Sequence, residues 1–259
     1  MDGYLNLASA YRELGRTQPA RELLERALEL TPENVNVMQL LARVHMDRGD
    51  PETAAALFKA IIARSPRYPQ AYYGLSEAEL ARQNYAAAVE PLQQLHETFP
   101  DTAMPQYEIG MVWLKAGRLD RAEEWIRRSL ETTPRLRSAH FNLAVIAEQR
   151  GQADAARQEY EAELELHPDH GEAGVNYGLL CAGSGDMVAA ERAFAGVIEH
   201  NPDEFPAAYY LLARARVEQN KVDRETLGLA RRAVELDPSL ERARRLALQL
   251  EQALGGGAG

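Results

Sequence analysis

The chain has 259 residues, of which 46% are hydrophobic and 26% charged, as in ordinary globular proteins. Its 39 acidic and 29 basic side chains give a formal net charge of −10, which disfavours binding to nucleic-acid phosphates. The single cysteine, Cys181, excludes an internal disulfide and a cysteine-based zinc site, and no apolar run is long enough to cross a bilayer. We therefore expect no nucleic-acid partner, no membrane insertion and a cytoplasmic location.

Prolines recur along the chain at a fixed interval, which is the first sign of its organisation. Six of them stand 34 residues apart, and a seventh follows after 36: Pro32, Pro66, Pro100, Pro134, Pro168, Pro202 and Pro238. A fixed period of this length is typical of repeat proteins, in which each unit is one small helical motif. The spacing predicts seven units, at residues 1–34, 35–68, 69–102, 103–136, 137–170, 171–204 and 205–238.

Other residue types keep the same phase. Twelve positions before the proline stands a small residue: Ala20, Ala54, Ala88, Ala122, Ala156 and Ala190. Eight positions before it stands a large one: Leu24, Phe58, Leu92, Ile126, Tyr160 and Phe194. Seventeen positions before it stands glycine in most units: Gly15, Gly49, Gly117, Gly151 and Gly185. A mid-unit glycine ends one helix and the proline ends a second, so each unit is predicted to be a helix-turn-helix.

Taken in chain order, the units differ in detail. In the second, Asp50 and Pro51 open the second helix with a cap and a proline at its first position. In the third, Gln83 replaces the glycine, and Pro91 is expected to bend the helix without breaking it. In the fifth, Glu163 occupies a position that normally holds a small buried residue, such as Ala27 in the first unit.

The sixth and seventh units are the least regular. The sixth carries Gly171, Gly174, Gly178 and Gly183 in its first helix, so residues 171–185 are expected to be the softest segment or to border an internal cavity. In the seventh, the loops must absorb two extra residues. A helix over 239–254, with leucine and alanine along one stripe, is predicted to cap the array, and residues 255–259 to form a disordered tail.

These columns resemble the tetratricopeptide repeat, a 34-residue helical pair. The bulky residue that opens the first helix in that family is matched by Tyr4, Met38, Tyr72 and Tyr209, whereas Gln106, His140 and Gly174 depart from it. The resemblance implies an all-α, right-handed superhelical solenoid, with the first helices lining a concave face. Such repeats bind other proteins, so the resemblance also implies a protein or peptide as the partner.

The resemblance places a candidate peptide-binding groove on the first helices. The side chains that would line it are Tyr73, Tyr107, Met111, Leu114, Phe141, Asn142, Val145, Val175, Asn176, Leu179 and Tyr210. Most are aromatic or aliphatic and would bury apolar side chains of a partner. The alternative is that they pack against neighbouring helices, since stripes at helical spacing often belong to a core.

Two polar modes of binding by this family fit less well. Asn6, Asn142 and Asn176 resemble part of an asparagine ladder that holds a peptide backbone, but Leu40, Gly74, Glu108 and Leu211 interrupt it. The clamp that holds a terminal carboxylate in chaperone-binding members is absent, because its positions carry Leu5, Ser9, Leu40 and Gln70.

No catalytic motif is visible, so we predict neither an enzyme nor a bound cofactor. His167, Asp169 and His170 share one loop, but a solvated turn explains them better than a metal site. Cys181 falls on the inward phase of a helix, as a buried hydrophobic residue would.

Three functions remain open. The preferred one is an interaction scaffold that binds a peptide or helix of a partner. The second is a structural array that forms a homo-oligomer through its first repeat, which has no protecting helix before it. The third is an accessory domain of a larger, possibly enzymatic protein from which this segment derives.

Overall fold

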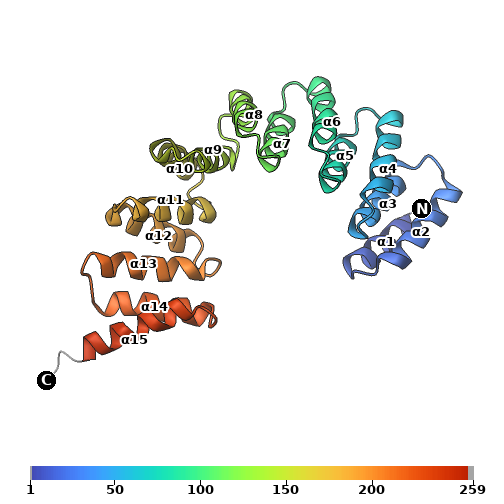
Figure 1. The fold of residues 1–259 in the computed structure, drawn as a ribbon. Helices are drawn as coiled ribbons and strands as arrows, with labels where there is room; N and C mark the ends of the chain where they lie inside the picture. The colour runs from blue at the N-terminus through green and yellow to red at the C-terminus, as the bar shows by residue number, and fades with distance from the viewer. Residues whose placement is uncertain (1, 256–259) are drawn as a thin grey trace. The chain divides into compact units, whose positions relative to one another are not determined.

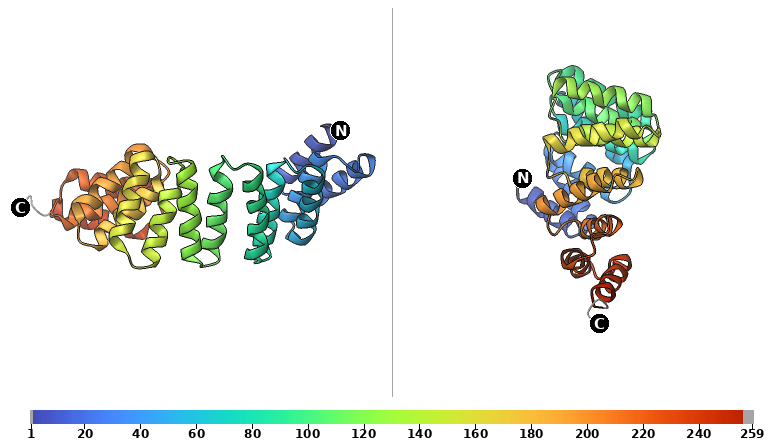
Figure 2. Two further views of the ribbon diagram at one scale, coloured as in Figure 1. Left: turned by 90° about the horizontal axis from the view of Figure 1, so that it is seen from above. Right: turned by 90° about the vertical axis from the view of Figure 1, so that its left-hand side faces the viewer.

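The computed structural model describes residues 2–255, which form fifteen α-helices and no strand within that range (Figure 1). The helices divide into an N-terminal unit that ends at Pro134 and a C-terminal unit that begins at Arg135. Within each unit, consecutive helices pack against one another in sequence order (Figure 2). The predicted all-α architecture of tandem helix-turn-helix repeats is confirmed.

The N-terminal unit contains four helical pairs. They are α1 (Asp2–Glu13) with α2 (Thr17–Leu30), α3 (Val35–Asp47) with α4 (Pro51–Arg64), α5 (Pro69–Ala81) with α6 (Tyr85–Thr98), and α7 (Ala103–Lys115) with α8 (Leu119–Thr132). In Figure 1 the first helices α3, α5 and α7 lie along one side of this unit, and the second helices α4, α6 and α8 along the other.

The C-terminal unit contains three further pairs and a last single helix. They are α9 (Ala139–Gln149) with α10 (Ala153–Leu166), α11 (Gly171–Gly183) with α12 (Met187–His200), α13 (Pro206–Glu218) with α14 (Arg224–Leu236), and α15 (Glu241–Gly255). Helix α15 thus includes Gly255, which the sequence had placed in a disordered tail; the rest of that predicted tail, 256–259, lies outside the described residues.

The turn inside each pair has one residue in the left-handed region, as the glycine column predicts. Five turns use glycine there, with φ between 68° and 85°. Gln83 takes the same conformation at φ 59°, and Asn220 does so in the seventh repeat at φ 62°. The turn geometry is therefore kept even where a side chain must accept a strained backbone.

The alanine and large-residue columns form the interface between helices. All six alanines twelve positions before the proline are fully buried, and the six large residues eight positions before it are at most 2% exposed. Alanine lets the helix axes approach closely, and the large neighbour fills the groove beside it. Burial of these repeated contacts is what holds successive pairs together.

Helix starts in both units are capped as the sequence predicts. The Asp50 carboxylate accepts a hydrogen bond from the Thr53 N–H at 3.1 Å, with Pro51 at the first helical position. Asp186 accepts one from the Ala189 N–H at 3.0 Å. Helix α6 continues through Pro91, which lies buried within it; the bend expected there remains a prediction.

Helix α9 starts later than the 34-residue period implies, and Glu163 on α10 provides the missing cap. Its fully buried carboxylate accepts hydrogen bonds from the backbone N–H of Ser138 at 2.9 Å and of Phe141 at 3.3 Å. His170 Nδ1 lies 2.8 Å from the same carboxylate, and the His170 ring contacts that of Phe141 at 5.0 Å. The other repeats carry a buried alanine, serine or aliphatic residue at this position, whereas here a carboxylate links α10 to the starts of α9 and α11.

Three of the four glycines of α11, Gly171, Gly174 and Gly178, are tightly packed. A Cβ on Gly171 would lie 2.2 Å from the Phe205 ring, and one on Gly178 would lie 2.5 Å from the Phe194 ring. Val197 approaches Gly174 in the same way, at 2.5 Å. Large side chains from neighbouring segments thus fill the room that these three glycines leave, whereas a Cβ on Gly183 would have no atom within 4 Å, and Gly183 borders a hollow between α11 and α13. That residues 171–185 are the softest segment remains a prediction.

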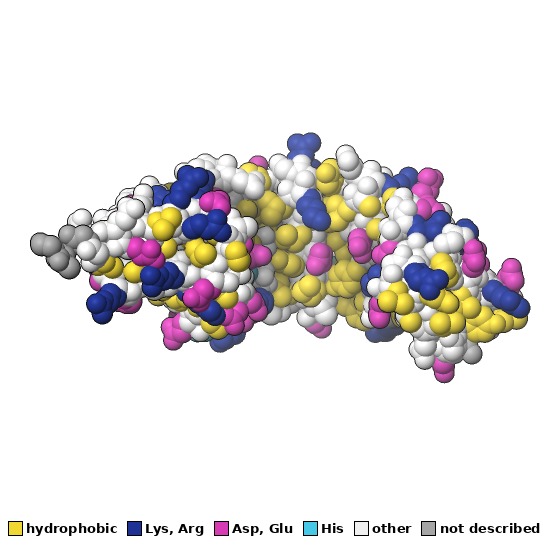
Figure 3. All heavy atoms as spheres, turned by 90° about the horizontal axis from the view of Figure 1, so that it is seen from below, with side chains coloured by type: hydrophobic (Ala, Val, Ile, Leu, Met, Phe, Trp, Pro, Cys, Tyr) yellow, Lys and Arg dark blue, Asp and Glu magenta, His cyan; other side chains and the backbone are white. Residues whose placement is uncertain are grey.

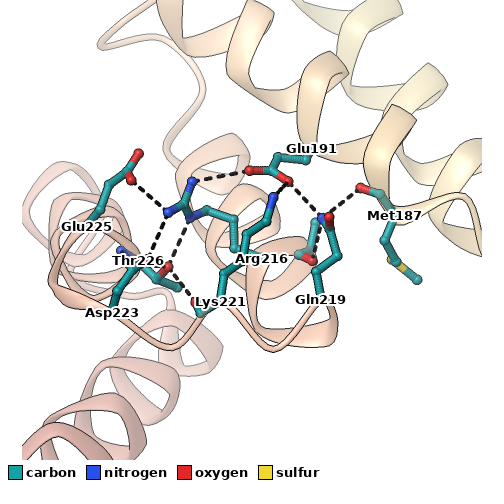
Figure 4. Close-up of polar contacts among 9 residues, drawn as sticks. Met187, Glu191, Arg216, Gln219, Lys221, Asp223, Glu225 and Thr226 are labelled. Atoms are coloured by element: carbon teal, nitrogen blue, oxygen red, sulfur yellow. Dashed lines mark hydrogen bonds and ion pairs between the residues drawn. The ribbon is translucent and has the colours of Figure 1, made fainter.

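The two extra residues of the seventh repeat are absorbed in its loops, as predicted. A polar network holds the longer turn between α13 and α14 (Figure 4). The Arg216 guanidinium, only 13% exposed, donates to Glu191 on α12 at 3.2 Å and to Asp223 at 3.1 Å. Glu191 also accepts from Gln219 and Lys221, at 2.8 and 2.6 Å. The network ties this turn to the preceding repeat.

Candidate functional site

The first helices of the N-terminal unit enclose a hollow of about 540 Å³ between α5 and α7. We call it the Glu108 hollow. It is lined by Tyr73, Ser76, Glu77, Leu80, Leu92, Met104, Glu108 and Lys115. Its apolar part is built from the Tyr73 ring and the Leu80, Leu92 and Met104 side chains, with Met104 43% exposed. On the face of the molecule that Figure 3 shows, hydrophobic side chains gather in patches with acidic and basic side chains between them.

Glu108 is the unusual group in this hollow. It lies half-buried, and within residues 2–255 no hydrogen bond or ion pair to its carboxylate is found. Burial raises the pKa of Glu108 above its usual range, although the positive charge of Lys115 partly opposes this effect. Burial and the nearby Glu108 charge together raise the pKa of the Tyr73 hydroxyl. The hollow therefore carries a desolvated carboxylate that Lys115 compensates only in part and to which no residue from 2 to 255 forms a hydrogen bond or ion pair.

Of the predicted groove residues in this unit, only Tyr73 lines the Glu108 hollow. Tyr107, Met111 and Leu114 are half-buried on α7 but are not part of its lining. The lining residues of α7 are instead Met104, Glu108 and Lys115. The predicted groove residues of α7 thus lie on a neighbouring part of the helix surface, rotated about the helix axis from the residues that line the hollow.

The spacing of Met104, Glu108 and Lys115 was the signal that could have found this face. The three residues stand four and seven positions apart, so they share one side of a helix. In the asparagine-ladder hypothesis, Glu108 is only an interruption. The acidic side chain at this inward position is instead the central polar group of the hollow.

The C-terminal unit has a smaller hollow, of about 230 Å³, between α11 and α13. We call it the Leu179 hollow; it is lined by Leu179, Ala182, Gly183, Met187, Phe194, Leu211, Arg214, Ala215 and Glu218. Leu179, a predicted groove residue, is 46% exposed there. Its two charged groups neutralise each other, since Arg214 and Glu218 form an ion pair at 3.0 Å on α13.

A third hollow, of about 300 Å³, lies between α13 and α15 and is basic. We call it the Arg242 hollow. The predicted groove residue Tyr210 lines it together with Arg214, Arg242, Arg245, Leu246 and Gln249. A cationic group would be repelled from this surface.

Four predicted groove residues of the C-terminal unit serve packing at least in part. Phe141 stacks near Tyr160, with ring centroids 6.1 Å apart. Asn142 is only 7% exposed and donates to the Ser138 carbonyl at 2.7 Å, so its amide takes part in packing at the start of α9. Val145 and Val175 are half-buried and line none of the three hollows.

The asparagine ladder does not form a uniform row. Asn6 is exposed and Asn176 half-buried, whereas Asn142 is buried. A peptide backbone could therefore reach these amides only at separate points.

The loop histidines are held by separate partners. His167 Nε2 lies 3.2 Å from the Arg135 carbonyl, and Asp169 accepts from Arg137 at 2.9 Å, whereas His170 contacts Glu163. No group of three or more potential ligands that could hold a metal ion is found among residues 2–255. Cys181 is buried, and burial raises the pKa of its thiol.

Family models of the tetratricopeptide repeat match residues 1–44, 40–101, 92–137, 107–171 and 147–215. The chain therefore belongs to the tetratricopeptide-repeat family, whose members are in general non-catalytic interaction scaffolds. No described helix combines the length and apolar character needed to span a bilayer.

Two curated proteins share part of this sequence. The type IV pilus assembly protein PilF of Pseudomonas aeruginosa is 25% identical over 134 residues, which cover 50% of this chain and 52% of PilF. Protein FlbA of Caulobacter vibrioides is 29% identical over 127 residues, covering 48% of this chain and 21% of FlbA. The matches thus extend over about half of one relative and a fifth of the other.

A solved structure agrees over nearly the whole chain. The C-terminal part of a TPR repeat-containing protein from Cytophaga hutchinsonii superposes with a TM-score of 0.67 at 11% identity, covering 93% of this chain and 98% of that one. At this identity, the similarity establishes the fold alone.

Proposed function

We propose that this protein is a non-catalytic scaffold that binds a peptide or helix of a partner protein on the first-helix faces of its two units. The observation that carries the proposal is the Glu108 hollow, which combines a large, mostly apolar opening with a desolvated carboxylate. A carboxylate in such a place lowers stability unless something else compensates its charge. Sites that keep a charged group buried at the expense of stability are often functional.

The Leu179 hollow supports the same function in the C-terminal unit. Its exposed leucine and the neighbouring methionine, Met187, offer an adaptable apolar surface for a partner side chain. Because the charges at its edge are already paired, affinity there would come from apolar burial.

Site-specific photo-crosslinking tests the proposal. Benzoylphenylalanine would be placed at Met104 or Leu179, in the two hollows, and at Glu131, an exposed residue on the second helix α8. We expect one defined polypeptide to crosslink in the host cell from Met104 and from Leu179 but not from Glu131. Equal crosslinking from all three positions, or from Glu131 alone, would contradict a site on the first-helix faces.

A second candidate function is self-association through the first repeat. Leu7, Leu14 and Leu30 there are 47%, 72% and 62% exposed, so the first repeat presents three large apolar side chains that a second copy could bury. Light scattering would measure the oligomeric state of the wild type and of a double variant that carries Leu14→Ser and Leu30→Ser. A dimer that the double variant converts to a monomer supports self-association, and a wild-type monomer at high concentration contradicts it.

A further inference from the structure

The Glu108 hollow has a polarity that restricts what it can hold. Its acidic groups are Glu108, half-buried in the middle of α7, and the exposed Glu77 on α5. Its one basic group, Lys115, is exposed and lies seven residues from Glu108, about 10 Å along the helix axis. The centre of the hollow is therefore negative, and the positive charge lies at one end.

A long cationic side chain matches both parts of this lining. Its methylene groups would pack on Leu80 and Met104, while its charged head would reach the Glu108 carboxylate. The Tyr73 ring, whose hydroxyl interacts electrostatically with Glu108, would lie against the same head group. Arginine fits better than lysine, because its planar guanidinium can both pair with a carboxylate through two hydrogen bonds and stack on an aromatic ring.

We infer that the Glu108 hollow recognises an arginine side chain of the partner polypeptide, with Glu108 as the group that pairs with the guanidinium. The inference rests on the proposed function and assigns its ligand chemistry. The two hollows of the C-terminal unit described above do not offer this chemistry: Glu218 of the Leu179 hollow is already paired with Arg214, and the Arg242 hollow is lined by arginines.

Peptide selection on the full chain tests the inference. Random dodecapeptides displayed on phage would be selected on the immobilised protein, and the bound peptides resynthesised with each arginine replaced by citrulline, which has nearly the same shape without the charge. We expect one arginine to recur among the selected peptides. Its replacement by citrulline should weaken binding about tenfold or more.

Two protein variants locate the effect. Glu108→Gln keeps the size of the side chain and should weaken the arginine peptides to a similar degree, with little further loss on citrulline substitution. Glu131→Gln removes the same charge from an exposed site on α8 and should leave binding unchanged. An equal loss in both variants would show general attraction to an acidic protein and would overturn the inference. Circular dichroism would verify that each variant is folded.

The failure of this inference can be told from that of the proposed function. The selected peptides could bind the Tyr73→Ala variant more weakly and yet bind equally well after citrulline substitution and to Glu108→Gln. The hollow would then bind peptides without recognising arginine, and the inference alone would be wrong. If no selected peptide depends on Tyr73 or on Leu179, the first-helix faces are not the binding surface, and both are wrong.

Discussion

Two buried or half-buried carboxylates, Glu163 in the C-terminal unit and Glu108 in the N-terminal unit, have pKa values shifted in opposite directions. Glu163 in the C-terminal unit is fully buried, accepts two backbone hydrogen bonds and contacts His170. Burial alone would raise the pKa of Glu163, but these hydrogen bonds outweigh it and hold the pKa below its usual range. Glu108 in the N-terminal unit has no such partners among the residues that the structure describes, and burial raises its pKa.

The difference separates a structural charge from one available for binding. The protein itself stabilises the ionised form of Glu163, so removing that carboxylate should harm the fold. The protein instead disfavours the ionised form of Glu108, so its charge is of use only to a ligand. Three measurements test this distinction.

The largest effect is expected for Glu163→Ala. The substitution leaves the Ser138 and Phe141 N–H groups without their acceptor and removes the partner of His170, and we expect it to lower the free energy of unfolding by about 3 kcal/mol. Urea unfolding followed by circular dichroism would measure it. Glu165→Ala, at an exposed position on the same helix, should change stability by less than about 0.5 kcal/mol. Equal effects of the two would contradict the capping role.

Acidification should reveal the opposite signs of the two pKa shifts. Since the pKa of Glu163 is lowered by folding, its stabilising contribution is present above the unfolded-state pKa and lost as the pH falls through the folded-state value. The stability difference between wild type and Glu163→Gln should therefore shrink on acidification. The pKa of Glu108 is raised, so its ionisation costs stability as the pH rises through the folded-state value.

The corresponding measurement is urea unfolding of wild type, Glu163→Gln and Glu108→Gln at intervals from pH 7 to pH 3. Relative to wild type, Glu163→Gln should be the less stable protein at neutral pH and Glu108→Gln the more stable. Both differences should narrow in acid. Differences of the same sign would show that the two carboxylates do not differ in the way described.

The smallest effect is expected for Glu108→Gln at neutral pH. Removing a desolvated charge without hydrogen bonds should stabilise the fold, but by less than about 1 kcal/mol because the side chain is only half-buried. Thermal unfolding would detect this as a small rise in Tm. A clear loss of stability would mean that Glu108 already has a structural partner, and would weaken the case for a ligand there.

The repeat architecture could be predicted from the sequence because it depends on local spacing. The 34-residue period placed the buried alanines and large residues, and Gln83 could stand in the glycine column because the turn tolerates it there. Residues in these columns lie on the side of a helix that packs against its neighbour, and the same positions pack in this way in each repeat.

The candidate site could be predicted only in part, because it depends on side chains that differ between repeats. Tyr73, Leu179 and Tyr210 do line hollows, but the central group Glu108 was not among the predicted residues. Whether a charged side chain forms an ion pair depends on which side chains of the next helix come within contact distance. The repeat spacing does not determine this. The same limit applies to Phe205 over Gly171, where the filling residue lies outside the repeated columns.

The lengthened seventh repeat has a consequence for protein engineering. Helix α14 is offset by two residues from the 34-residue period, so Thr226 and Ala230 are the counterparts of Ala190 and Phe194, and both are fully buried. A standard repeat inserted after α12 would separate Arg216 from its acceptor Glu191, whereas Asp223, in the turn between α13 and α14, would stay beside it. The same turn is the natural place to vary the length of the chain without shifting the phase of the helices before it.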